Sequence, residues 1–383
     1  MKNSFHKTAL GLALAIGILA CHDLPPLPPQ TGGDLEDIPY DPQPYTIVKP
    51  DFFPNVPVPA DNPMTVDAVQ LGRRLFYDPI LSADSTQSCS SCHLPQGNFT
   101  DNKAVSKGID GIAGRRSSMA LLNIAYATNG LFWDGRSPSL EDQALRPVED
   151  PIELHHTWPQ VVEQLKDHPA YPALFRKAFG IKDRSEMTKE LAAKALAQFE
   201  RILISSGTSK FDQYVQTQNP DVFDEEELDG YLMYFEEAWK YGLALPDAQC
   251  FHCHGGITLT GNNYFNNGLD AVASLGDFVD KGRFEVTGNW SDQGKFRSPT
   301  LRNIALSAPY MHDGRFQTLE EVVANYAKKG KGVSNEDPNL PLMGLNAPNN
   351  TLGEAHKKAL VKFLHTLTDT VFVKNPDIQN PFQ

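Results

Sequence analysis

The chain has 383 residues, and its 47 Asp and Glu exceed its 34 Lys and Arg, which gives a formal net charge of −13 at pH 7. This acidic balance argues against nucleic acid as a partner, because binding to a phosphate backbone depends on Lys and Arg. The chain contains five cysteines. So few cysteines would constrain little of a chain this long, which argues against a disulfide framework.

The first twenty residues have the pattern of an export signal. Lys2 and Lys7 give a basic start to an apolar run, Thr8–Ala20, that is too short to span a bilayer as a mature helix. The run ends at Cys21, as in bacterial lipoprotein signals, where the cysteine becomes the lipidated N-terminus. Leu19 is bulkier than the small residue usual there, so plain secretion or a retained anchor stays open. We expect a signal peptide over residues 1–20 and a periplasmic or outer-membrane-surface protein, lipid-anchored through Cys21.

Residues 21–61 are rich in proline and acidic residues and lack a helical period, which predicts a flexible tether. The rest of the chain is long for one core and suits two domains, over residues 62–208 and 209–383. Strand-like alternation is scarce, and stretches rich in Gly, Asn and Pro, such as 261–276 and 329–350, predict loops. Helical periodicity appears in Val66–Tyr77, Trp158–Leu165, Thr188–Ile204, Glu225–Ala238, Thr318–Ala327 and Leu352–Leu367.

Two C-x-x-C-H pentapeptides stand early in the two halves. Their spacing is the attachment signal for c-type haem, in which two thiols bond one porphyrin and the histidine becomes an axial iron ligand. A zinc site would place its two C-x-x-C pairs about 15–20 residues apart, and a redox dithiol ranks third. We therefore predict a mainly α fold of two cytochrome c-like domains, each enclosing one covalent haem c. The residues that would bind haem are Cys89, Cys92, His93, Cys250, Cys253 and His254.

From about Val66 to Asp369 the chain resembles the bacterial di-haem cytochrome c peroxidases, including the methylamine-utilisation (MauG-type) branch. The order of the two haem motifs contributes to this resemblance. The other markers are Phe132–Arg136, Leu140–Ala144, Pro147-Val148, Pro151–Glu153, Phe296, Pro299–Asn303 and Ala308–Gly314.

The resemblance implies a role for each haem and for three nearby side chains. The N-terminal haem, with His93 as proximal ligand, would meet peroxide, and the C-terminal haem, held by His254, would relay electrons. Trp133 matches a tryptophan between the haems, although a core aromatic is the simpler reading. Glu153 matches the distal acid–base and Gln143 its neighbouring amide. A carboxylate suits that place because peroxide cleavage requires a proton to move from the near oxygen to the far one.

Two positions depart from the classical peroxidases. Where those carry a histidine that caps the peroxidatic iron, counting without gaps from His93 leads to Ile109, which cannot ligate iron. We expect that iron to be five-coordinate or water-bound when oxidised. Where they carry a methionine as sixth ligand of the relay haem, Tyr326 stands, as in the methylamine-utilisation branch, and Met343 is the rival ligand. A phenolate would lower the haem potential, whereas methionine raises it.

A calcium ion between the domains is a further implication of the resemblance. Ser307 and Pro309 match its backbone-carbonyl ligands. Ser117 replaces its amide ligand and offers a weaker oxygen for a hard cation.

Three functions follow from these residues. The leading one reduces hydrogen peroxide to water with electrons from a small periplasmic cytochrome c or cupredoxin, and an acidic surface would steer a basic donor. The second uses peroxide or oxygen to oxidise a residue of a partner protein, and Ile109 and Tyr326 favour that branch. The third is a non-catalytic di-haem electron carrier, against which Ile109, Gln143 and Glu153 argue. A homodimer agrees with the resemblance, but nothing in the sequence decides it.

Overall fold

The computed structural model describes residues 33–383, so the predicted signal peptide and Cys21 lie outside the described residues. Within that range the chain is mainly helical, as predicted. Its only sheet there is one antiparallel pair of two-residue strands, β1 (Tyr264–Phe265) and β2 (Phe296–Arg297). None of the described helices is long and apolar enough to cross a membrane.

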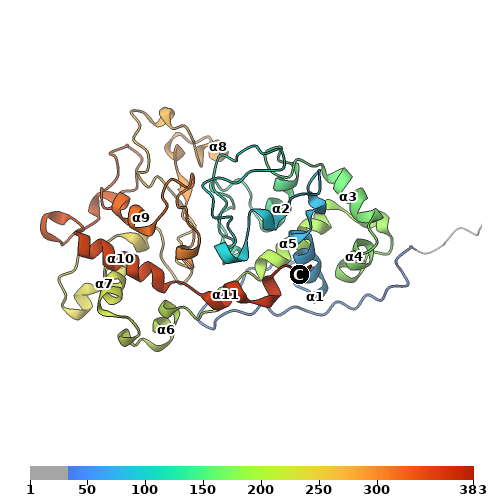
Figure 1. Cartoon of the computed structure of the whole chain (residues 1–383), viewed down its shortest axis with the longest axis horizontal. Helices are drawn as coiled ribbons and strands as arrows, with labels where there is room; N and C mark the ends of the chain where they lie inside the picture. Colours follow the sequence, from blue (N-terminus) through green and yellow to red (C-terminus); the bar gives the residue numbers. More distant parts are fainter. Residues whose placement is uncertain (1–32) are drawn as a thin grey trace, which may run out of the picture.

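The helices form two halves that lie next to each other along the long axis of the molecule (Figure 1). All six predicted helices are present, with ends shifted by at most three residues. The helices that periodicity did not predict each have ten residues or fewer: Leu140–Glu149, Tyr171–Phe179, Lys210–Thr217, Phe284–Thr287 and Thr370–Lys374. The first half contains α1 (Val66–Tyr77), α2 (Leu140–Glu149), α3 (Trp158–Asp167), α4 (Tyr171–Phe179) and α5 (Lys189–Arg201). The second contains α6 (Lys210–Thr217), α7 (Glu225–Phe235), α8 (Phe284–Thr287), α9 (Leu319–Tyr326), α10 (Glu354–Thr366) and α11 (Thr370–Lys374).

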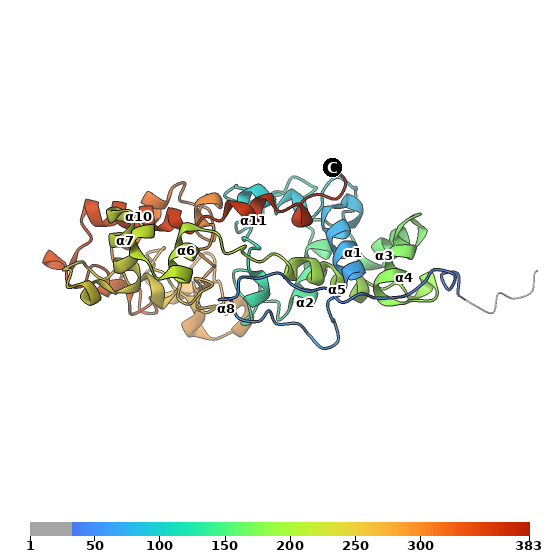
Figure 2. The same ribbon diagram turned by 90° about the horizontal axis from the view of Figure 1, so that it is seen from below.

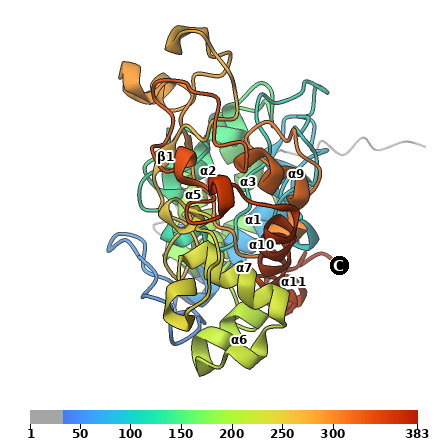
Figure 3. The same cartoon turned by 90° about the vertical axis from the view of Figure 1, so that its left-hand side faces the viewer.

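One helix crossing recurs in both halves, with α1 against α5 in the first and α7 against α10 in the second. Gly72 lies at the first crossing, where a Cβ would come 1.9 Å from the carbonyl oxygen of Ala195. Gly230 lies at the second, where a Cβ would come 2.1 Å from the carbonyl oxygen of Ala359. Glycine therefore allows each pair of backbones to approach closely. Figure 3 looks onto the second half along the long axis, with α7, α9 and α10 in view.

The C-terminal segment returns from the second half to the first (Figure 2). Phe372 of α11 and Ile378 belong to the hydrophobic core of the first half. Two residues of α1 hold this segment in place. The Arg73 guanidinium donates to the carbonyl of Gln379 at 2.7 Å, and the Tyr77 hydroxyl donates to the carbonyl of Ile378 at 2.6 Å. The first core therefore includes residues beyond the predicted division at 208/209.

Residues 33–61 pack against the body of the molecule. Leu35 belongs to the first core, and Phe53 lies in a small cluster with Tyr126 and Ile204. The Tyr126 hydroxyl donates to the carbonyl of Pro54 at 3.0 Å. This packing differs from the flexible tether predicted for residues 21–61, because apolar side chains between the prolines anchor the segment.

Candidate active site

The first C-x-x-C-H motif directs a histidine into the interior of the first half. The motif begins with a 3₁₀ turn, Cys89–Ser91, and the His93 N–H donates to the carbonyl of Cys89 at 3.0 Å. Nδ1 of His93 lies 2.7 Å from the carbonyl oxygen of Phe99. Since a carbonyl can only accept, Nδ1 carries the ring proton and leaves Nε2 free as a metal ligand. Burial lowers the pKa of His93, which keeps the ring neutral.

The second motif repeats this geometry. Nδ1 of His254 donates to the carbonyl of Pro299 at 3.0 Å, and burial lowers the His254 pKa to about 4. The Tyr234 hydroxyl donates to the backbone carbonyl of His254 at 2.7 Å. Burial also raises the pKa values of Cys250 and Cys253 to about 12, so both remain thiols at neutral pH.

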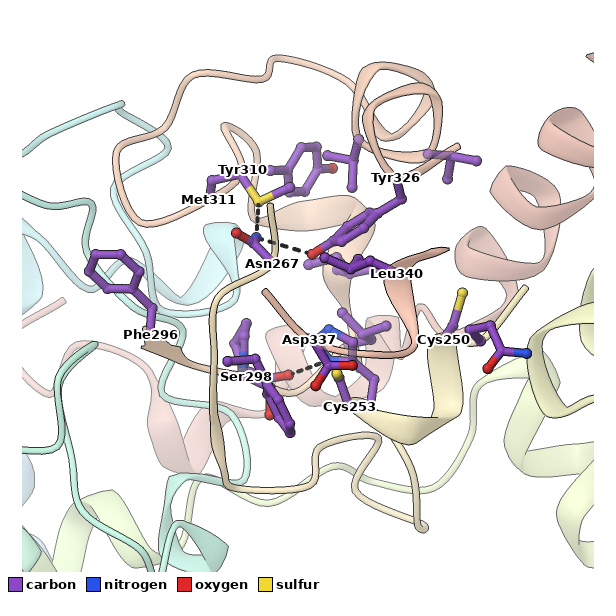
Figure 4. A pocket seen from close by; sticks show the side chains of 18 of the residues that line it. Cys250, Cys253, Asn267, Phe296, Ser298, Tyr310, Met311, Tyr326, Asp337 and Leu340 are labelled. Carbon is purple, nitrogen blue, oxygen red and sulfur yellow. Dashed lines mark hydrogen bonds between the residues drawn. The ribbon is translucent and has the colours of Figure 1, made fainter. Parts of the chain in front are cut away.

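Above the second motif lies a cavity with mainly apolar walls (Figure 4). Tyr326, at the end of α9, and Met343 both line it, so the structure brings both predicted ligand candidates to the same space. The Asn267 amide donates to the Tyr326 hydroxyl at 3.2 Å and to Sδ of Met311 at 3.5 Å. Burial raises the Tyr326 pKa to about 12, and the hydrogen bond from Asn267 opposes this rise. Which side chain ligates the haem iron stays a prediction.

A partly buried carboxyl group, Glu153, lies near the thiols of the first motif. Its charge contributes to the raised pKa values of Cys89 and Cys92. Burial, followed by the nearby Asp150 carboxylate, raises the Glu153 pKa to about 7, and Arg136 opposes the rise. At neutral pH this group therefore exchanges a proton readily, as a general acid–base must.

The turn that carries Glu153 is bound to the end of α2. The N–H of Glu153 donates to the carbonyl of Asp150 at 3.0 Å, and the next N–H, of Leu154, donates to the carbonyl of Pro147 at 3.2 Å. Gln143 is half-buried on the same helix. Its predicted role beside Glu153 stays a prediction.

The position of the missing capping histidine is occupied by a loop that packs against Glu153. The N–H of Ile109 donates to the carbonyl of Glu153 at 3.0 Å. The two nearest histidines in the chain have other partners. Nδ1 of His155 lies 2.6 Å from the Asp110 carboxylate, and Nδ1 of His156 accepts the N–H of Thr157 at 2.8 Å. That the first iron has no capping histidine stays a prediction from Ile109.

Trp133 connects the surroundings of the two motifs. It lines the second cavity, and its indole N–H donates to the carbonyl of Ser117 at 2.9 Å. The next residue, Ser118, donates through its hydroxyl to the carbonyl of Cys92 at 2.7 Å and lies 3.3 Å from Nδ1 of His93. A residue that lines the second cavity is thereby joined to the environment of the first histidine.

The three predicted calcium ligands lie in segments held by other hydrogen bonds, and their joint role stays a prediction. The Ser117 hydroxyl donates to the carbonyl of Met311 at 2.9 Å. The Asn102 amide donates to the carbonyls on both sides of Ser307, those of Leu306 and Ala308, each at 2.8 Å. Pro309 follows a cis peptide bond. No cluster of three or more His, Cys, Asp or Glu in residues 33–383 could hold a metal ion, so calcium would depend on carbonyl and hydroxyl oxygens.

Several residues at these sites were not predicted from the sequence. Ser118, Asn267 and Met311 lie in segments without regular structure, where no periodicity indicates their direction. Glu200 lies on α5, and its carboxyl is buried near Cys89 with one oxygen lacking a partner. Burial raises the Glu200 pKa to about 8. The signal for Glu200 was an acidic residue on a helix face that is otherwise apolar.

These features define the class, a mainly helical protein with two buried histidine–dithiol sites suited to c-type haem. A sequence model of the family described as di-haem cytochrome c peroxidase matches residues 66–220. The chain is 33% identical over 359 residues to a cytochrome-c peroxidase of Denitromonas iodatirespirans, with 86% of this chain and 90% of that one covered. It is 32% identical to the methylamine utilization protein MauG of Methylorubrum extorquens, with 82% and 81% covered.

One solved structure is similar to this chain over nearly the same length. It is that of a MauG-like protein associated with microbial copper homeostasis, with a TM-score of 0.76 and 32% identity. The match covers 88% of this chain and 100% of that one. The chain belongs to the di-haem cytochrome c peroxidase family and is an oxidoreductase.

Membership of this family implies two haem c groups, and the residues present fit them. Each motif offers two thiols and one neutral imidazole with its Nε2 free. The second site adds a cavity with apolar walls, as a porphyrin requires. Cys89, Cys92 and His93 would hold the first haem, and Cys250, Cys253 and His254 the second.

Proposed function

We propose that this protein reduces hydrogen peroxide to water at its first haem site, with two electrons supplied by a small redox protein through the second. The observation that carries this proposal is Glu153, a partly buried carboxyl beside the first haem motif whose pKa is raised to about 7. An electron carrier without chemistry of its own would have no use for a proton-exchanging group there.

The side chains divide the work in the following way. The overall reaction consumes one hydrogen peroxide, two electrons and two protons and forms two water molecules. Bound haem supplies the iron that carries the electrons. Glu153 accepts the proton of the near peroxide oxygen and delivers it to the far oxygen, which leaves as water. Gln143 orients the peroxide by hydrogen bonding, and Trp133 lies on the route between the two sites.

Replacing Glu153 with Gln tests this proposal. Glu153→Gln keeps the size of the side chain and removes its basic form, so peroxide turnover should fall by about 10²–10⁴-fold. Haem content and the visible spectrum should stay unchanged. Glu149→Gln, which alters an exposed carboxylate at the end of the same α2 helix, is the matched control. Normal turnover by Glu153→Gln would remove Glu153 from the mechanism.

The first haem site should react without prior reduction, because Ile109 stands where the classical peroxidases carry the capping histidine. A low-temperature EPR spectrum of the fully oxidised protein should therefore contain one high-spin and one low-spin ferric signal. Two low-spin signals would contradict this expectation and indicate a ligand from elsewhere in the chain.

Oxidation of a partner protein is the second candidate function. Tyr326 favours it, since an anionic phenolate ligand stabilises higher iron oxidation states. The similarity to MauG and to the MauG-like copper-homeostasis protein also supports it. Reduced cytochrome c offered with peroxide separates the two functions. A peroxidase should rapidly oxidise two donor molecules for each peroxide reduced, whereas slow donor oxidation with correspondingly slow peroxide reduction would favour protein oxidation. Tyr326→Phe should alter the low-spin spectrum, and an unaltered spectrum would favour Met343 as the ligand.

We also propose a lipid anchor at Cys21 and one calcium ion near Ser117, Ser307 and Pro309. Cys21→Ser should release the protein from the membrane fraction, and unchanged fractionation would reject the anchor.

For the calcium ion, dialysis against a calcium chelator should lower both the bound calcium and the melting temperature. Calcium-free protein from the first purification onward would reject the ion.

A further inference from the structure

Arg297 has a guanidinium group buried at the second haem cavity. It is the second residue of β2, and its N–H donates to the carbonyl of Trp133 at 2.8 Å. The residue is 5% exposed and lines the same cavity as Cys250 and Cys253. Its neighbours Phe296 and Ser298 mark this wall in Figure 4.

This guanidinium lacks a carboxylate partner among the described residues. Its only polar neighbour there is a weak acceptor, Sδ of Met119, 3.8 Å from Nη2, and its Nε has no partner. The other two arginines that are as deeply buried in residues 33–383 each have a carboxylate at 2.7 Å. Those pairs are Arg302–Asp212 and Arg201–Glu141.

An unpaired charge at such a place is costly. Burial lowers the pKa of Arg297 to about 10, so the group still carries its charge at neutral pH. A buried cation without a counter-charge is strongly unfavourable even after relaxation, because the lost hydration is not replaced by an opposite charge. The site therefore calls for an anion inside the cavity, and a planar guanidinium matches a carboxylate in shape and in hydrogen-bonding pattern.

We propose that Arg297 binds a propionate carboxylate of the haem attached at Cys250 and Cys253, and that its positive charge raises the reduction potential of that haem. The haem brings its own carboxylates into the cavity that Arg297 lines. A nearby positive charge favours the reduced iron, which has one positive charge less. The inference depends on the proposed haem at this site and adds a residue that binds and tunes it.

The test is a spectroelectrochemical titration of both haems in the intact holoprotein. Arg297→Gln should lower the potential of the second haem by at least a tenfold change in the one-electron equilibrium, which is 59 mV. Arg297→Lys should restore most of the loss, because it restores the charge. Arg283→Gln is the matched control. Arg283 lies 4.2 Å over the ring of Tyr264, the strand partner of Arg297, and donates to backbone carbonyls outside the cavity.

Each outcome supports or overturns the assignment. If the mass of Arg297→Gln shows two haems and its potentials are unshifted, the role of Arg297 is overturned but the proposed haem sites are not. A shift confined to the first haem would have the same meaning. An equal shift in Arg283→Gln would show a general charge effect and overturn it too. A mass without two haems would overturn the proposed function together with this assignment. If Arg297→Gln does not fold, the propionate bending band in the resonance Raman spectrum decides: it should move in Arg297→Lys, and a fixed band overturns the proposal.

Discussion

At the scale of single residues, the two haem sites differ in the polar groups that surround their histidines. His93 and His254 each donate through Nδ1 to a backbone carbonyl, and each ring has its pKa lowered by burial. Glu153 lies near only the first motif and has its pKa raised. Two similar attachment sites thus receive different surroundings, one with a proton carrier and the other with a cavity of mainly apolar walls.

The raised pKa of Glu153 predicts how activity depends on pH. Burial favours the neutral acid, so the carboxylate that accepts a proton prevails only above a pKa of about 7. The rate kcat/KM for peroxide should therefore rise about tenfold per pH unit below that value and level off above it. The residual activity of Glu153→Gln should lack this rise. Stopped-flow measurements from pH 5 to 9 would show it, and a wild-type profile that is flat across pH 7 would contradict it.

The side chains proposed to lie at the two haem sites were predictable to different degrees. Both histidines and all four attachment cysteines follow from C-x-x-C-H alone, because that spacing has a specific chemical use. The places of Glu153 and Trp133 came from the resemblance, since no local pattern reveals them. Arg297 and Asn267 could not be predicted. Arg297 is notable because it lacks a carboxylate partner within residues 33–383, and Asn267 because it contacts Tyr326 across the cavity. Neither feature can be read from a short stretch of sequence.

At the scale of elements, the repeated helix crossing explains why two glycines stand in otherwise good helices. Gly72→Ala would place a methyl group 1.9 Å from the carbonyl oxygen of Ala195, and that backbone atom cannot move alone. The expected cost is about 1–3 kcal/mol of unfolding free energy, despite the better helix propensity of alanine. Gly114→Ala, whose nearest neighbours lie 3.6 Å away, should change stability by less than about 0.5 kcal/mol. Denaturant unfolding compares the two, and equal values would refute the close crossing.

The elements also contain a repeat that helix periodicity alone does not reveal. Leu131 bridges to Ser137 in the first half as Tyr310 bridges to Phe316 in the second. Each bridge is followed closely by a capped helix, α2 or α9. Trp133 and His312 hold equivalent positions in the two bridged loops, and the centroids of their rings lie 6.5 Å apart. A comparison of the two halves could have predicted the equivalent places of Trp133 and His312, but the approach of their rings depends on how the halves pack.

At the scale of the whole molecule, the returning C-terminal segment joins the halves. Phe372→Ala would leave a void in the first core, with an expected cost of about 3–5 kcal/mol. Hydrogen exchange should then accelerate in α1, which the segment touches, and much less in α7, which it does not. The exposed Val371 in the neighbouring position provides the control, since Val371→Ala should leave both helices protected. Faster exchange in α7 alone would contradict this packing.

This connection also imposes an order on synthesis. The ribosome makes the chain from its N-terminus, so residues up to Leu203 are complete while Phe372 and Ile378 are still untranslated. At about 5–20 residues per second, the remaining stretch takes roughly 9–35 s. During that interval the first half lacks part of its interior, and the thiols of Cys89 and Cys92 belong to an unfinished fold. Completion of the chain would then close the first half around whatever its cysteines have already bound.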